Sequence, residues 1–161
     1  MNQKGILLAS ETLKIVIAVI SITFLVYFLT SLYFTGITKE KMREAEAILK
    51  TSGESLGNVI NLLGEGEEKQ FQFPNPSNWY LFSFVEDKPN SCAGKNCLCI
   101  CGNALVKFFN GQIKKCDKEG SCLILDNLKE FEQIKIQSPQ KGLTKISVKK
   151  INNEVQISEI K

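Results

Sequence analysis

The stretch from Ile15 to Phe34 reads IVIAVISITFLVYFLTSLYF and contains no charged residue. Twenty helical residues at about 1.5 Å each span about 30 Å, which is the thickness of the hydrocarbon core of a bilayer. The apolar region of a cleaved signal peptide is shorter, about 7–15 residues. Moreover, the run ends in Leu32 to Gly36, which offers no small-residue cleavage site. The stretch therefore predicts a transmembrane helix.

The cysteines indicate on which side of the membrane the rest of the chain lies. The flanking cations nearly balance and do not orient the helix: Lys4, Lys14, Lys39, Lys41 and Arg43. All six cysteines lie between Cys92 and Cys122, in a chain with no histidine. Structural disulfides persist mainly in oxidising compartments. We therefore expect a single-pass protein of the cell membrane, with a cytoplasmic N-terminus and an extracytoplasmic C-terminal domain.

An amphipathic helical segment follows the membrane span. Apolar residues recur there at helical spacings of three and four: Met42, Ala45, Ile48, Leu49, Leu56, Val59, Ile60 and Leu63. Gly53 and Gly57 weaken the helix in its middle, which predicts a break near residues 52–54. The apolar stripe can pack onto the domain that follows or onto another chain, and the spacing does not separate these alternatives.

These patterns divide the chain into three parts. Residues 1–36 form the cytoplasmic N-terminus and the transmembrane helix, and residues 37–64 form an amphipathic helical stalk. Residues 65–161 form a cysteine-containing extracytoplasmic β domain. The charged, glycine-bearing stretch at 64–69 is expected to be a flexible hinge between the stalk and this domain.

The predicted strands of the C-terminal part are mostly antiparallel. Trp79 to Val85 is apolar on both faces, which suits a central strand that is buried on both sides. Asn110-Gly111 separates two short runs, 105–109 and 112–116, and is a strong hairpin signal. The predicted fold class is α+β: a transmembrane helix and helical stalk, followed by an antiparallel sandwich or a single curled sheet with disulfides.

A second hairpin is expected at the C-terminus, around Asn152-Asn153. Pairing across this turn sets Val148 opposite Ile157 and Lys150 opposite Val155. This register also places Ile146 opposite Glu159, and it collects the apolar residues of both strands on one face.

The spacing of the cysteines is C-x4-C-x-C-x-C-x14-C-x5-C, and all six are disulfide candidates: Cys92, Cys97, Cys99, Cys101, Cys116 and Cys122. On a strand, Cys97, Cys99 and Cys101 point to the same face with parallel Cβ vectors, about 6.6 Å apart, so they should not pair with one another. We favour Cys92–Cys97 as a local disulfide. Cys99 and Cys101 then pair with Cys116 and Cys122, in an order that the spacing leaves open.

Few features of the chain suggest catalysis. No histidine is present to act as a base, and no phosphate-loop or dinucleotide fingerprint occurs. Glu65, Glu67 and Glu68 lie in the expected flexible hinge, which cannot hold a catalytic geometry. We therefore predict a non-enzymatic protein with no catalytic residue, no cofactor and no metal. A net charge of +3 also argues against a nucleic-acid partner.

The cysteines leave two alternatives to structural disulfides open. A metal site on Cys97, Cys99, Cys101 and one further cysteine is an alternative to disulfides, although the paired knuckles of structural zinc sites are missing. A thiol-redox protein is a second alternative, although a C-x-C pattern on an apolar strand differs from the C-x-x-C of such proteins.

The N-terminus, Met1-Asn-Gln-Lys4-Gly5 followed by the apolar helix, resembles archaeal type IV pilin-like proteins. The resemblance implies that a short basic leader is cut beside the Lys-Gly pair. It also implies that the helix anchors the subunit and packs into a filament, with a β-rich head outside. The segment from Pro74 to Cys101 also resembles uncharacterised archaeal single-pass membrane-anchored proteins.

Together these observations predict a membrane-anchored surface or envelope protein, specifically a pilin-like assembly subunit. Its expected partners are the membrane, further copies of itself and other envelope proteins. The alternative is a monomeric envelope module that binds a ligand or a protein, and a metal-binding or thiol-redox protein is the third reading.

Overall fold

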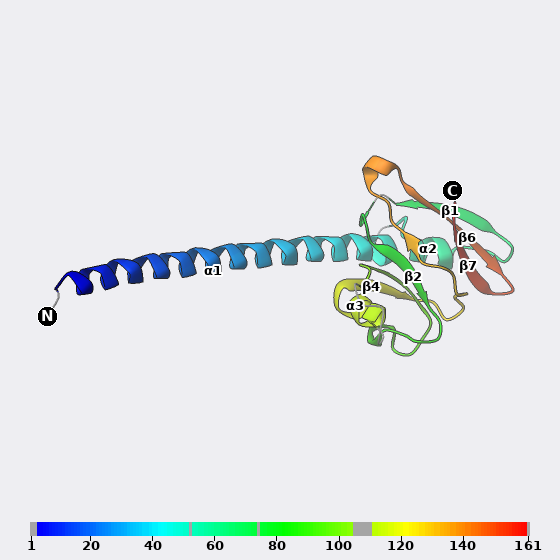
Figure 1. Ribbon diagram of the computed structural model, residues 1–161. Helices are drawn as coiled ribbons and strands as arrows, with labels where there is room; N and C mark the ends of the chain where they lie inside the picture. The colour runs from blue at the N-terminus through cyan, green and yellow to red at the C-terminus, as the bar shows by residue number, and fades with distance from the viewer. Residues whose placement is uncertain (1–2, 52, 74, 105–110, 161) are drawn as a thin grey trace. The chain divides into compact units, whose positions relative to one another are not determined.

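The computed structural model describes residues 3–51, 53–73, 75–104 and 111–160. They form two compact units, 1–38 and 39–161. The elements are, in order, α1 (Gln3–Glu46), η1 (Ala47–Thr51), α2 (Leu56–Asn61), β1 (Glu68–Phe73), β2 (Tyr80–Phe84), η2 (Asn90–Cys92), β3 (Cys97–Cys101), α3 (Gly111–Glu119), β4 (Gly120–Ile124), β5 (Ile134–Lys135), η3 (Pro139–Lys141), β6 (Thr144–Ile151) and β7 (Glu154–Glu159) (Figure 1).

Helix α1 contains the apolar stretch. Its length and composition are those of a helix that can cross a membrane, and a signal sequence near an N-terminus meets the same criterion. The large apolar side chains from Leu13 to Phe34 are each more than half exposed. Thr23 and Thr30 donate their hydroxyl protons to the carbonyls of Val19 and Val26, at 2.8 and 2.7 Å. These hydroxyls are therefore satisfied within the helix, as an apolar surrounding requires.

The helical path changes at the predicted place. The π-helical segment η1 ends at Thr51 and α2 begins at Leu56, with the Ser55 side chain accepting a hydrogen bond from the Asn58 N–H at 3.4 Å. This confirms the predicted break. Met42 and Ile48 are partly buried at the edge of the core that the sheets also form. Most of the apolar stripe is fully buried in this core: Ala45, Leu49, Leu56, Ile60 and Leu63. The structure thus resolves the open alternative in favour of packing onto the chain's own domain.

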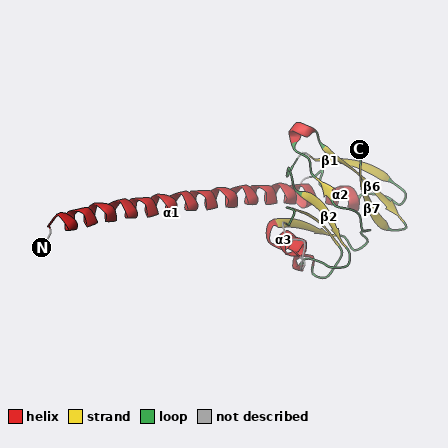
Figure 2. Ribbon diagram, viewed as in Figure 1, coloured by secondary structure: helices red, strands yellow, loops and turns green. Residues whose placement is uncertain are grey.

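The strands form two antiparallel sheets rather than a single curled one. One has the order β1-β6-β7 and the other β4-β3-β2-β5. Within the domain, the first sheet and α3 lie at opposite sides, with β4 beside α3 (Figures 1 and 2). The C-terminal hairpin has the predicted register, with Val148 opposite Ile157, and Asn152 and Asn153 have the positive φ angles of its turn.

The four-stranded sheet is buried on both faces, as the pattern in β2 predicts. Leu81 belongs to the main core that the two sheets share with α2 and η1. Phe82 and Phe84 point to the other face, where they pack against the cysteines. The same alternation runs along β3, whose residues are all buried.

One predicted hairpin is wrong. Residues 112–116 form part of α3 and not a strand, and the run at 105–109 lies outside the described residues. The helix is explained by its composition, because lysine, glutamine and glutamate favour helices. Ile113 and Cys116, three residues apart, pack against the cysteine face of the sheet. Tertiary contacts therefore override the local signal of Asn110-Gly111.

The expected flexible hinge is also corrected. Glu68 is the first residue of β1, and its carboxylate accepts a hydrogen bond from the Ser147 hydroxyl. The Glu65 carboxylate accepts hydrogen bonds from the backbone N–H groups of Asn152 and Asn153, in the β6–β7 turn. Glu67 accepts one from the Gly64 N–H at 2.9 Å. Glu65 thus connects the turn before β1 to the β6–β7 turn, Glu68 joins β1 to β6, and Glu67 closes the turn itself.

Gly57 lies where α2 meets η1. A Cβ at this position would lie 2.7 Å from the carbonyl oxygen of Leu49 and 3.3 Å from Leu123 Cδ2. We expect Gly57→Ala to push the two segments apart and to lower the free energy of unfolding by about 1–3 kcal/mol. Urea denaturation of the full chain in detergent measures this effect.

The matched control for Gly57 is Gly53, four residues earlier. Nothing lies within 4 Å of a Cβ built on Gly53, and its φ is not positive. We expect Gly53→Ala to change stability by no more than about 0.5 kcal/mol. Equal destabilisation by the two variants would contradict the contact argument.

Candidate functional site

The candidate site is the cysteine-bearing face of the four-stranded sheet. Cys97, Cys99 and Cys101 point to this face from β3, as the period of a strand predicts, and each is 0% exposed. Their partners come from three other elements: Cys92 from η2, Cys116 from α3 and Cys122 from β4. The disulfides are Cys92–Cys97, Cys99–Cys122 and Cys101–Cys116. The first is the local pairing that the spacing favours.

The register of β3 and β4 decides the pairing that the spacing leaves open. Cys99 lies directly opposite Cys122, with 4.1 Å between their Cα atoms. Cys101 lies opposite Gly120, which has no side chain. Cys101 therefore bonds to Cys116, which α3 brings over the sheet.

Gly120 is the position that lets α3 approach. A Cβ on Gly120 would lie 2.5 Å from the carbonyl oxygen of Cys116 and 2.8 Å from Cys101 Cβ. Both of these atoms belong to the disulfide-bonded residues themselves. The α3–β4 junction therefore needs a glycine for close approach, and not for a positive φ angle.

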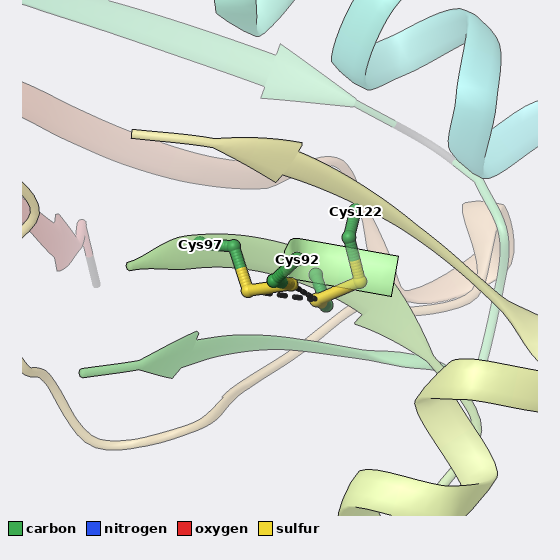
Figure 3. A group of neighbouring side chains, drawn as sticks. Cys92, Cys97 and Cys122 are labelled. Atoms are coloured by element: carbon green, nitrogen blue, oxygen red, sulfur yellow. Dashed lines mark hydrogen bonds between the residues drawn. A yellow bond between two sulfur atoms is a disulfide. The ribbon is translucent and has the colours of Figure 1, made fainter. Parts of the chain in front are cut away.

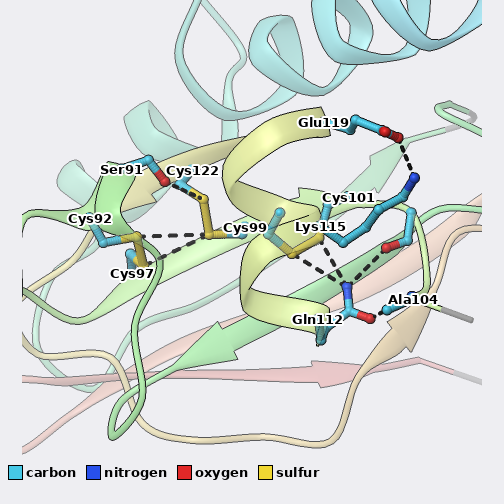
Figure 4. The surroundings of a disulfide bond; sticks show 12 residues. Ser91, Cys92, Cys97, Cys99, Cys101, Ala104, Gln112, Lys115, Glu119 and Cys122 are labelled. Atoms are coloured by element: carbon cyan, nitrogen blue, oxygen red, sulfur yellow. Dashed lines mark hydrogen bonds and ion pairs between the residues drawn. A yellow bond between two sulfur atoms is a disulfide. The ribbon is translucent and has the colours of Figure 1, made fainter. Parts of the chain in front are cut away.

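Four of the six sulfurs form a compact group, which we call the four-sulfur cluster: Cys92, Cys97, Cys99 and Cys122. All four Sγ atoms lie within 4.8 Å of one another. Figure 3 labels three of these residues, Cys92, Cys97 and Cys122. Cys99 Sγ lies 3.9 Å from Cys92 Sγ and 3.8 Å from Cys97 Sγ, across two different disulfides (Figure 4). Because disulfide sulfurs carry no proton, these are van der Waals contacts and not hydrogen bonds.

Gln112 is a polar residue of this site that the sequence analysis does not single out, because it falls within the wrongly predicted hairpin. Its side-chain N–H group donates to the Gly102 carbonyl at 2.9 Å and lies 3.4 Å from Cys101 Sγ (Figure 4). Its side-chain oxygen accepts from the Ala104 N–H at 2.8 Å. Gln112 thereby links the first turn of α3 to the chain that leaves β3.

Asp117 holds the short helix η2 in place. Its carboxylate accepts a hydrogen bond from the Ser91 backbone N–H at 2.8 Å. This bond is the main reason why the pKa of the Asp117 carboxyl lies below its ordinary value, since the N–H stabilises the charged form. The Ser91 hydroxyl in turn lies 3.6 Å from Cys122 Sγ (Figure 4).

A groove of about 420 Å³ reaches Cys122 from outside. Its cationic walls come from Lys39, Arg43 and Lys50, and Glu46 provides one carboxylate. Cys122 is 8% exposed, whereas Cys99, its disulfide partner, is fully buried. Cys122 is therefore the member of the four-sulfur cluster that a molecule in the groove can approach.

The disulfides of the cysteine face are arranged as structural cross-links between elements. Every cysteine is in a disulfide, so none is a thiolate nucleophile in this state. The disulfides join β3 to η2, β4 and α3. Comparisons with protein-family models, with curated proteins and with solved structures found no match to this chain.

Proposed function

We propose that the chain is a non-enzymatic, membrane-anchored surface or envelope protein whose β domain lies outside the cytoplasm. The observation that carries this proposal is the set of three disulfides buried under α3 and η2, in a domain that follows an apolar helix. Disulfides of this structural kind form and persist in oxidising compartments. In this proposal the apolar helix anchors the domain in the membrane.

The specific role that we propose is that of a pilin-like assembly subunit. The large apolar side chains of α1 from Leu13 to Phe34 are more than half exposed on every side of the helix, so nothing in the described chain covers them. Lipid covers such a surface in a membrane, and neighbouring helices would cover it in a filament. The Lys4-Gly5 pair at the start of the chain supports the second environment through its resemblance to a leader cleavage site.

The second candidate function is a monomeric envelope module that binds an extended peptide. A groove of about 590 Å³ runs between α2 and β1 and is lined by Val59, Leu62 and Phe71. Leu62 is 75% exposed there. Strand β1 is the edge of its sheet, so its outer backbone groups can pair with an added strand. Glu11 and Lys14 also favour this candidate, because charges suit the interior of a helix filament poorly.

The intact mass of the chain from native membranes tests these proposals. For a pilin-like subunit we expect loss of the first few residues, with the new terminus beside the Lys4-Gly5 pair. We also expect six hydrogens fewer than in the fully reduced chain, because three disulfides have formed.

The control variant is Gly5→Leu, which alters the pair and should leave the leader uncut. A chain that keeps Met1 would contradict the pilin-like role and favour the monomeric module. Six free thiols in freshly isolated membranes would contradict the extracytoplasmic location.

A further inference from the structure

In the four-sulfur cluster, two separate disulfides lie in contact with each other. Two disulfides can stabilise a domain without lying close to each other. Here the two pairs meet, and Cys99 Sγ is within 3.9 Å of both sulfurs of the other disulfide. Three of these cysteines are 0% exposed and Cys122 is 8% exposed.

We propose that the four-sulfur cluster binds one Zn²⁺ as a tetrathiolate site when its two disulfides are reduced. A tetrahedral zinc with Zn–S bonds of about 2.3 Å places its four sulfurs about 3.8 Å apart. The contacts between the two disulfides, 3.8 and 3.9 Å, already have this separation. The sulfurs that are now bonded to each other must move apart, and Cys122 Sγ, which lies within 4.8 Å of the other sulfurs, must adjust its position. Rotation about the side chains allows both movements.

The backbone that carries the four sulfurs is held without the disulfides. Strands β3 and β4 are joined by an antiparallel ladder along their whole length. The loop that follows Cys92 is tied to the end of β4 by a hydrogen bond from the Leu125 N–H to the Asn96 carbonyl, at 2.9 Å. The Ser91–Asp117 hydrogen bond anchors the other side of Cys92. Reduction therefore leaves the ligands near one another, which is what a preformed metal site needs.

Atoms and charges balance in this conversion. Two molecules of a phosphine, each oxidised to its phosphine oxide with the oxygen of one water molecule, give four electrons to the two disulfides, and the two water molecules supply the four protons of the resulting thiols. Zn²⁺ then displaces the four protons, and the site carries a net charge of −2. Four buried thiols without histidine suit this borderline-soft metal, whereas Mg²⁺ and Ca²⁺ prefer oxygen ligands.

The groove beside Cys122 complements this charge. Lys39, Arg43 and Lys50 line it against a single carboxylate, Glu46, so cations predominate at the accessible side of the cluster. Cations near a sulfur favour its thiolate form and so favour both reduction and metal binding. The same groove provides the reductant and the ion with a path to Cys122.

The test uses the full chain in detergent, reduced with a phosphine and then freed of it without oxygen. Co²⁺ serves as the optical probe, because tetrahedral thiolate coordination gives it characteristic sulfur-to-metal absorption. We expect one Co²⁺ per chain, displaced by Zn²⁺, and no such absorption with the oxidised chain. The third disulfide provides the control, since Cys101→Ser with Cys116→Ser removes two buried cysteines outside the cluster and should leave the spectrum unchanged.

Alkylation of the unmutated chain gives a second readout that does not depend on a variant's folding. With Zn²⁺ bound, we expect a maleimide to modify only Cys101 and Cys116, whereas all six cysteines should react once a chelator is added. Absence of the thiolate spectrum at saturating Co²⁺, or modification of the cluster cysteines with Zn²⁺ present, would overturn the proposal. So would loss of metal binding in the control variant, because the outer pair would then supply ligands.

Discussion

In a chain that already carries Cys101→Ala and Cys116→Ala, replacing both Cys99 and Cys122 by alanine is expected to lower the free energy of unfolding by about 3.4 kcal/mol from loop closure alone. This background is needed because the Cys101–Cys116 disulfide lies within the same loop and would shorten it. The disulfide spans 23 residues, and the entropy that it removes from the unfolded chain grows with the length of the closed loop. Urea denaturation of the oxidised full chain in detergent measures the loss. The single tryptophan, Trp79, reports on it because it is buried in the main core.

The matched control is the pair Cys92→Ala with Cys97→Ala in the same background. It removes two sulfurs from the same buried cluster, so the loss of packing is similar, but its loop spans only 5 residues. The loop-closure term is then about 2.1 kcal/mol, which leaves a difference of about 1.4 kcal/mol between the variants. Neither variant leaves a free thiol, so the one remaining disulfide does not reshuffle. Equal losses, or a larger loss in the control, would contradict the loop-closure explanation.

Replacing Leu49 by alanine is the second change with a large expected effect. Leu49 lies in η1, is 0% exposed and belongs to the core that both sheets share. Its truncation leaves a cavity in a region where backbone contacts with Gly57 limit relaxation. We expect the free energy of unfolding to fall by about 2–5 kcal/mol.

Leu62 provides the control for Leu49, because it follows α2 and is 75% exposed. We expect Leu62→Ala to change stability by no more than about 0.5 kcal/mol in the same urea titration. If Leu49→Ala lowered stability by less than about 1 kcal/mol, the segment after α1 would not be an integral part of the core of the domain.

Local sequence patterns correctly predict those parts of the fold that are determined by residues close together in the chain. The apolar run from Ile15 to Phe34 predicts a helix, and α1 contains it. The C-terminal hairpin has its predicted register because the alternation of two adjacent strands and a short turn leave few alternatives. Period 2 likewise places Cys97, Cys99 and Cys101 on one buried face.

Local sequence patterns predict the wrong structure where contacts with distant segments favour a different one. Asn110-Gly111 predicts a hairpin, but residues 111–119 form α3, whose Ile113 and Cys116 cover the cysteine face. Gly120 allows this close approach, and no local pattern distinguishes it from a glycine in a turn. Glu65 likewise looks like part of a flexible hinge until its hydrogen bonds to the β6–β7 turn are known.

The sequence by itself determined that an apolar helix precedes a mostly antiparallel β domain, and that Cys97, Cys99 and Cys101 must seek partners outside their own strand. These conclusions depend on helix length and strand period, which are properties of consecutive residues. Only the tertiary structure decided that Cys99 pairs with Cys122 and that two disulfides meet in the four-sulfur cluster. The reason is physical: the pairing depends on the register between β3 and β4 and on the space above Gly120, and both are set by contacts between segments that are distant in the chain.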